Sequence, residues 1–188
     1  IGPSCAVADY QEDQTRVWSG TQNPHHLRTE LARLIHRREA EIEVIRLEAA
    51  GCYGRNCADD VSADAVLLSR AVGRPVRVQL TREQEHAWEP KGTAQLMDVN
   101  GGMNADGSVA GYDFATRYPS NGAPTLALLL TGEVPNTPAV FEMGDGTAIP
   151  PYNYHNLRGV MHAKPPTVRA ASPRVRMSWS SVASAWMV

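Results

Sequence analysis

A glycine-containing turn near the middle of the chain carries the residues best suited to chemistry. Gly51 and Gly54 flank the aromatic residue Tyr53, after the strand-like run 42–47 and before the amphipathic run 61–72. Glycine lets the backbone come close to another group, and the unpaired amides of a helix N-terminus attract oxygen-rich anions. This turn therefore predicts a site for an anionic cofactor or an oxo group.

The three cysteines do not form a pattern that is typical of disulfides or of structural zinc. They are Cys5, Cys52 and Cys57, and no histidine near the last two completes a set of four N or S ligands. We therefore expect Cys52 and Cys57 to be small buried residues.

The composition is that of a globular protein. Hydrophobic residues make up 43% of the 188 residues, and the formal net charge is −2. This charge gives no electrostatic reason to expect nucleic acid as a partner. No apolar run approaches the roughly 18 residues that span a bilayer, so we expect no transmembrane segment.

Alternating and helical patterns predict the elements that hold the turn. Strands are expected at 5–9, 15–19, 41–47, 75–80, 93–99, 109–118 and 156–161. Helices are expected from Pro24 to Ile35, at 61–72 and from Thr81, with Gly73 ending the second. Asp106-Gly107 predicts a hairpin. Helices packed against a mixed sheet indicate an α+β fold.

One face of the second helix is expected to lie against the core. Its members, at helical spacing, are Val61, Ala65, Leu68 and Val72. By contrast, Glu83, Glu85 and Glu89 lie on a charged segment, and we expect them to be solvated.

Three segments of the chain match motifs of a known family, in the same order and with similar gaps. They are VWSGTQNP at 17–24, GCYGRN at 51–56 and GRPVRVQLTRE at 73–83. They resemble the S/G-T-Q-N loop, the G-G-F-G-G-K turn and the R-x-E segment of the molybdenum-cofactor-binding large subunits of the xanthine dehydrogenase and aldehyde oxidase family. The bacterial branch with isoquinoline 1-oxidoreductase and nicotinate dehydrogenase is the most similar. The resemblance covers roughly residues 1–166.

The resemblance implies roles for particular residues. Gln22 corresponds to a glutamine that hydrogen-bonds near a molybdenum oxo ligand, Tyr53 to an aromatic residue beside the metal, and Gly54 to a backbone donor aimed at the metal's oxygen. The implied cofactor-binding residues are Gln22, Gly51, Cys52, Gly54 and Arg174. Without the resemblance, Gln22 would be interpreted as a cap of the helix that begins near Pro24.

The resemblance also implies a function. The chain would be a fragment of a molybdenum hydroxylase that uses water to hydroxylate an N-heteroaromatic compound such as nicotinate, or to oxidise an aldehyde. The implied cofactor is a molybdenum–pterin of the cytosine dinucleotide type, with iron–sulfur clusters on a small partner subunit. The compartment stays open between the bacterial cytoplasm and the periplasmic face of the inner membrane. A rival hypothesis is a non-catalytic scaffold that docks the iron–sulfur subunit.

The chain departs from the family pattern in places. Cys57 stands where purine-oxidising members have a glutamate, so purine specificity is not expected. Val175 replaces the glycine of the Arg-Gly motif, and no carboxylate matches the family's general base. We expect residues 1–172 to form part of a larger molybdopterin-binding domain, and 173–188 to be an atypical tail, out of frame with the family.

Overall fold

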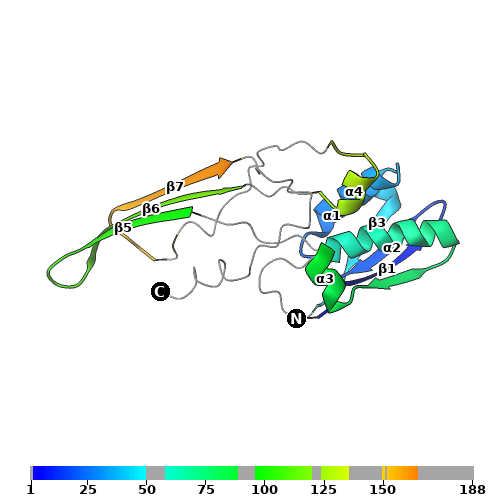
Figure 1. The fold of residues 1–188 in the computed structure, drawn as a ribbon, viewed down its shortest axis with the longest axis horizontal. Coiled ribbons are helices and arrows are strands. Elements are labelled where there is room, and N and C mark those ends of the chain that lie inside the picture. Colours follow the sequence, from blue (N-terminus) through cyan, green and yellow to red (C-terminus); the bar gives the residue numbers. More distant parts are fainter. Residues whose placement is uncertain are drawn as a thin grey trace. The chain divides into compact units, whose positions relative to one another are not determined.

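Two mixed sheets organise the part of the chain that the computed structural model describes, which is residues 2–49, 58–88, 96–119, 124–135, 150 and 152–164 (Figure 1). They belong to two units. The first unit contains the described residues up to 88 together with 124–135, and the second contains 96–119, 150 and 152–164. The α+β class predicted from the sequence is confirmed, although the single expected sheet is divided into two.

The first unit is a four-stranded sheet with helices on one face. Its strand order is β3-β2-β1-β4, where the strands are β1 (Cys5–Tyr10), β2 (Thr15–Ser19), β3 (Ile42–Arg46) and β4 (Val76–Gln79). Strand β2 runs parallel to β3, and β1 is antiparallel to both β2 and β4. The helical elements are α1 (Pro24–Leu34), the short 3-10 helix η1 (Glu39–Glu41), α2 (Ala58–Val72), α3 (Arg82–Trp88) and α4 (Leu126–Leu130).

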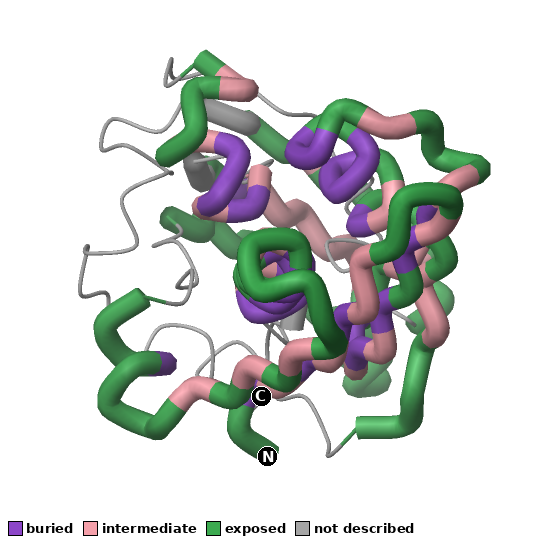
Figure 2. The backbone as a smooth tube through the Cα atoms, turned by 90° about the vertical axis from the view of Figure 1, so that its right-hand side faces the viewer, coloured by how far each residue is buried: buried purple, intermediate pink, exposed green. Residues whose placement is uncertain are grey.

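The core of this unit lies between the sheet and helices α1 and α2 (Figure 2). Ala6 and Ala8 on β1 and Val17 on β2 are buried. Small side chains on the central strand let a helix approach the sheet closely, which suits the contact between α2 and β1. Helix α1 contributes Leu27 and Leu31 at the predicted helical spacing. The predicted helix and its apolar face are therefore confirmed.

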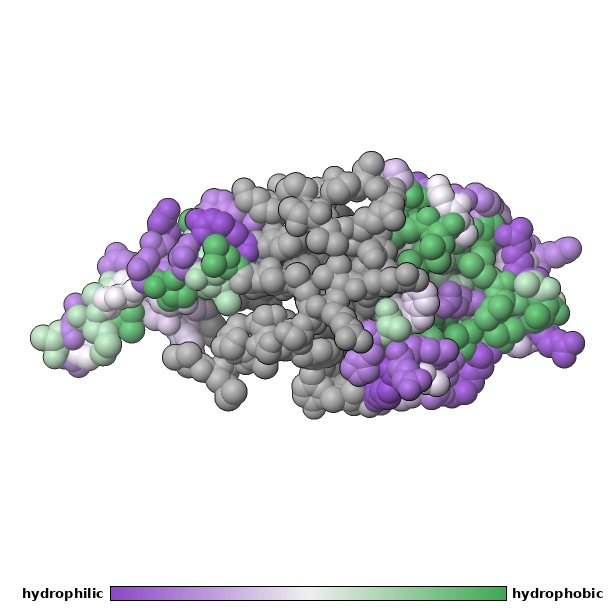
Figure 3. Space-filling view, in the orientation of Figure 1, coloured by the Kyte–Doolittle hydropathy of each residue, from purple (hydrophilic) through white to green (hydrophobic). Residues whose placement is uncertain are grey.

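The buried face of α2 differs from the predicted one. Val61 and Ala65 are buried as expected, but Leu68 is 48% exposed and Val72 is 51% exposed. Ser62 and Ser69 occupy core positions instead, because each finds a hydrogen-bond partner there. The helix is rotated relative to the prediction, and hydrophobic side chains gather on the outer surface over α2 (Figure 3).

The second unit is a three-stranded sheet in the order β5-β6-β7. Its strands are β5 (Leu96–Met103), β6 (Val109–Pro119) and β7 (Leu157–Lys164). Strands β5 and β6 form the predicted antiparallel hairpin, and Gly107 adopts the positive φ of 84° that its turn requires. Strand β7 pairs with β6 in parallel.

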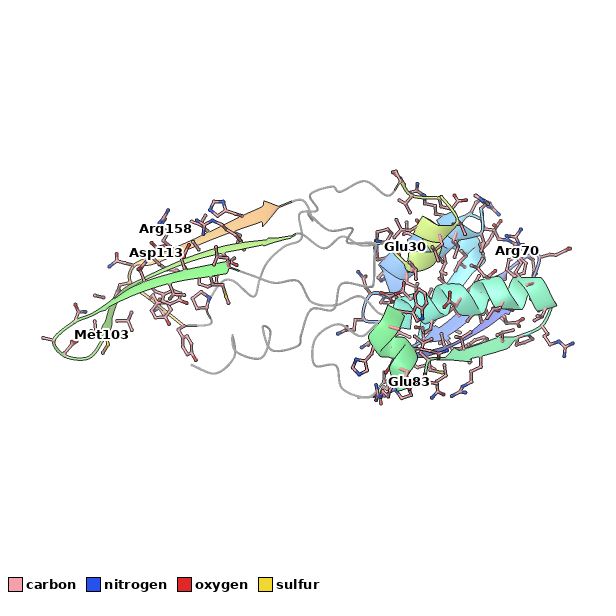
Figure 4. All side chains as sticks on the ribbon, in the orientation of Figure 1. Glu30, Arg70, Glu83, Met103, Asp113 and Arg158 are labelled. Carbon is pink, nitrogen blue, oxygen red and sulfur yellow. The ribbon has the colours of Figure 1, made fainter. Side chains whose placement is uncertain are left out.

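The two faces of this second sheet have different chemistry. Two ion pairs cross one face. Arg117 lies 2.6 Å from Asp98, and Arg158 lies 3.0 Å from Asp113, the two residues of the second pair being labelled in Figure 4. On the other face, the strand register places apolar residues in adjacent rows, namely Met97, Val99, Phe114, Leu157 and Met161. Four of these five side chains are exposed. The sheet therefore has one charged face and one apolar face, and the apolar face is largely exposed.

The remaining predicted elements are present, with shifts of one to a few residues at their ends. Gly73 ends α2 with a φ of 66°. Thr81 caps α3, since its hydroxyl accepts the Gln84 amide at 3.3 Å while the Gln84 side chain accepts the Thr81 amide at 2.8 Å. In the described residues, no helix is both long and apolar enough to cross a bilayer.

Candidate functional site

The parallel pair β2 and β3 defines the edge of the sheet at which the candidate site lies. Because the strands are parallel, their carboxyl ends meet at the same edge, where Ser19 pairs with Arg46. The chain that leaves β2 carries Gln22, whose side chain is exposed. The chain that leaves β3 leads toward the glycine-containing turn and then into α2.

The segment between β3 and α2 is hydrogen-bonded at both of its described ends to the end of β2 or to the loop that follows β2 and carries Gln22. On entry, the amide of Leu47 donates to the carbonyl of Ser19 at 2.9 Å. On exit, Asp59 in the first turn of α2 accepts the hydroxyl of Thr21 at 2.5 Å. The residues that precede and follow 50–57 therefore both contact the segment that carries Gln22.

Thr21 is the centre of this junction. It is fully buried, and its amide donates to the Ser19 hydroxyl at 3.2 Å. Its own hydroxyl accepts the amide of Asn23 at 3.1 Å, and its carbonyl accepts Nε of Arg46 at 3.2 Å. The two residues that flank Gln22 are thus linked to each other, and the loop is held by side chains from β2, β3 and α2.

A second hydroxyl contact joins α2 to the end of β2. Ser62 donates to the hydroxyl of Ser19 at 2.9 Å, and both side chains are buried. Such a contact is favourable because a buried hydroxyl without a partner would lose its bonds to water.

The neighbouring acidic residue of α2 holds a third segment. Asp60 accepts the amide of Leu126 at 2.9 Å, and the buried Glu30 of α1 accepts the amide of Thr125 at 3.3 Å. Glu30 also lies 3.4 Å from His26, and it is labelled beside α4 in Figure 4. Two carboxylates thereby cap the first turn of α4, and negative charge at a helix N-terminus is favourable.

The alternative role for Gln22, as a helix cap, is not what the structure shows. The N-cap residue of α1 is Asn23, and its side chain makes no capping hydrogen bond. Pro24 occupies the first turn, as the sequence predicted. Gln22 therefore lies one residue outside the helix, on the edge where the two loops leave the sheet.

Most of the site residues predicted from the sequence lie outside the described part of the chain. These are Gly51, Cys52, Tyr53, Gly54 and Arg174, and the tail 173–188 lies outside it as well. Their roles remain predictions. The structure instead identifies three residues around Gln22 to which the sequence analysis gave no role, namely Thr21, which lies within the first motif, Arg46 and Asp59. The acidic first turn of α2 is a helix-start signal that could have pointed to Asp59.

Glu85 is a correction to the sequence-based expectation that it is solvated. Its side chain is buried and accepts the amide of Ser4 at 2.5 Å and Nη1 of Arg82 at 2.6 Å. It therefore joins α3 to the start of the chain. Glu83 is exposed as expected, and Glu89 lies outside the described residues.

In the described ranges, no group of three or more His, Cys, Asp and Glu side chains could hold a metal ion.

Comparison with known proteins gives consistent matches. The family model of the molybdopterin cofactor-binding domain matches residues 1–163. A nicotinate dehydrogenase subunit of Pseudomonas putida is 69% identical over 185 residues, which is 98% of this chain and 15% of that protein. The chain thus spans about 15% of the length of this relative.

Two solved structures share the fold. Quinoline 2-oxidoreductase from Pseudomonas putida 86 has a TM-score of 0.50 and 26% identity, covering 63% of this chain and 16% of that one. The aldehyde oxidoreductase from Desulfovibrio gigas has a TM-score of 0.51 and 17% identity, covering 63% and 13%. The resemblance drawn from the three sequence motifs is confirmed. Since the family model covers most of its length, this chain belongs to the molybdopterin cofactor-binding domain family.

Proposed function

We propose that this chain forms part of the cofactor pocket of a molybdenum hydroxylase. The enzyme would hydroxylate an N-heteroaromatic acid of the nicotinate type with oxygen from water. Support for this substrate class comes from the 69% identity to the nicotinate dehydrogenase subunit. The fold is shared with both quinoline 2-oxidoreductase and an aldehyde oxidoreductase, so it does not separate the two substrate classes.

The observation that carries the proposal is a pair of hydrogen bonds. They join the two described ends of the segment between β3 and α2 to residues just before Gln22. Leu47 bonds to Ser19 and Asp59 bonds to Thr21, on either side of the glycine-containing turn. Gln22 follows Thr21 directly. This arrangement supports a pocket in which the Gln22 amide and the backbone of 51–57 act on the same ligand.

The described residues fit an oxygen-rich anionic cofactor. Gln22 presents a neutral amide that can donate without adding charge. The N-terminus of the 15-residue helix α2 lies at the same edge, and its dipole favours negative charge. The two carboxylates of its first turn, Asp59 and Asp60, are already engaged by Thr21 and Leu126. Both carboxylates therefore accept hydrogen bonds from groups of the protein itself.

The residues of this chain would bind and orient, while the cofactor would supply the oxygen transfer and accept the electrons. Gln22 and the turn 51–57 would hold the cofactor, with Gly54 as a backbone donor and Tyr53 as the wall beside the substrate. Electrons would leave to iron–sulfur clusters on a small partner subunit. A cofactor of the cytosine dinucleotide type is part of this proposal.

Metal analysis and one substitution test the proposal. The whole protein, purified with its partner subunit, is expected to contain molybdenum and pterin in a molar amount about equal to that of the protein. Elemental analysis measures the molybdenum, and fluorescence measures the pterin. In that protein Gln22→Ala should lower kcat by more than about tenfold, because a donor aimed at the reacting oxygen is lost. Turnover is measured with nicotinate.

Gln11→Ala is the matched control. Gln11 is also exposed, but it lies at the other end of β1 and β2, so its replacement should leave kcat unchanged. Unchanged turnover in Gln22→Ala would remove Gln22 from the site. A whole protein that contains neither molybdenum nor pterin would contradict the proposed function and favour the scaffold hypothesis.

A further inference from the structure

We infer that Thr21 and Asp59 form a positioning pair that fixes Gln22 against the first turn of α2. The inference rests on the proposed function, and it assigns both residues a role that acts through Gln22. Their hydrogen bond joins positions that are 38 residues apart in the chain. It links the residue directly before Gln22 to the helix on the far side of the glycine-containing turn.

The contacts of Thr21 restrain the backbone on both sides of Gln22. The Thr21 hydroxyl donates to Asp59 and accepts from the amide of Asn23, so one oxygen spans Gln22 and also reaches α2. The carbonyl of Thr21 accepts from Arg46. The bond to Asp59 is buried, so water does not compete for it, whereas the bonds from Asn23 and Arg46 are only partly buried.

Asp59 is suited to be the fixed partner. It is 8% exposed and belongs to the first turn of α2, where a negative charge is favourable. One turn further along the helix, Ser62 makes the parallel contact to Ser19. Because α2 is anchored both to the end of β2 and to the loop that follows it, the end of the helix cannot shift without breaking two buried bonds.

A donor that assists catalysis has to stay within about 0.5 Å of its productive position. Gln22 lies on a loop, so the position of its side chain depends on how the backbone on either side of it is held. The pair supplies the restraint through the backbone. Loss of the Thr21 hydroxyl is therefore expected to lower kcat through misplacement of Gln22, with a smaller change in KM.

The test compares Thr21→Val with Thr21→Ser in the whole, cofactor-loaded protein. Valine keeps the volume of threonine and loses the hydroxyl, whereas serine keeps the hydroxyl. Thr21→Val should lower kcat by about tenfold, and Thr21→Ser should restore most of it. The second measurement is hydrogen exchange at the Asn23 amide, which should become about tenfold faster in Thr21→Val only. Thr29→Val, at an exposed threonine of α1, is the matched control and should change neither value.

Asp59→Asn provides a second variant if Thr21→Val does not fold. Asparagine keeps an acceptor oxygen but loses the charge, so exchange at Asn23 should rise by about threefold. Wild-type exchange and turnover in Thr21→Val would overturn the inference, as would a Thr21→Ser variant that behaves like Thr21→Val. A protein without molybdenum would contradict the proposed function alone, because faster exchange at Asn23 in Asp59→Asn would still detect the pair.

Discussion

Glu85 is a charged side chain that the fold buries and uses as a clamp. Burial by itself would raise the pKa of Glu85, but the hydrogen bond from the Ser4 amide and the guanidinium of Arg82 outweigh it and lower this pKa below its ordinary value. The carboxylate form is therefore the one that the folded state prefers. A lowered pKa in the folded state means that protonation favours unfolding.

The stability of the first unit is expected to fall at acid pH through Glu85. Its contribution is fully present above the ordinary glutamate pKa of about 4.3, and it is lost as the pH falls through the lowered pKa of the folded state. Urea unfolding between about pH 6 and pH 3 measures this. Glu85→Gln should be less stable at neutral pH by about 1 kcal/mol and should show a smaller loss on acidification. Glu83→Gln, at an exposed neighbour, is the control, and equal pH profiles for all three proteins would contradict the role of Glu85.

At the scale of single elements, α4 shows how a very short helix is held by its neighbours. A helix of five residues is not stable by itself, because nucleation costs more than so few bonds return. Here Glu30 accepts the amide of the N-cap residue Thr125 and Asp60 accepts the amide of Leu126, the first residue of the helix. Leu128 packs into the core, and α4 contacts both α1 and α2. Both hydrogen bonds and apolar contacts thus come from outside the helix.

Two leucines of α4 provide a matched pair for a stability test. Leu128 is 2% exposed and Leu130 is 75% exposed. Leu128→Ala should lower the free energy of unfolding by about 2–5 kcal/mol, because it leaves a cavity in the core. Leu130→Ala should change it by less than about 0.5 kcal/mol. Denaturant unfolding measures both, and similar values for the two variants would show that α4 does not pack as described.

At the scale of the whole molecule, the two units differ in how much apolar surface they bury. The first has a core of alanine, valine, leucine and isoleucine side chains from strands and helices. In the described part of the second unit, Thr116 is the only buried residue, and every residue of β5 is exposed. Local stability follows the density of buried apolar contacts, so the second sheet is expected to open more easily.

Hydrogen exchange on the chain of residues 1–188 tests this difference. Amides of Ala8 and Val17 in the first sheet should exchange at least about tenfold more slowly than those of Val99 and Phe114 in the second. The same chain in denaturant supplies the intrinsic rates for comparison. Equal protection of the two sheets would mean that the second unit has a stabilising core beyond the described residues.

Local patterns in the sequence determined most of the secondary structure. Alternation, helical spacing, Gly73, Gly107 and the Thr81 cap each act within a few residues, so their effect can be read without the fold. The family motifs likewise predicted the loop with Gln22 as part of the site, whereas the turn that contains Gly54 lies outside the described residues.

Only the tertiary structure decided which groups meet. The partner of Thr21 is Asp59, and the partner of Thr125 is Glu30, which lies 95 residues away in the chain. The buried face of α2 also depends on contacts made across space, because Ser62 belongs in the core only where Ser19 can accept its hydroxyl. Hydrophobic spacing predicts which faces of a helix could be buried. Which face is buried depends on the side chains of the sheet that can contact it.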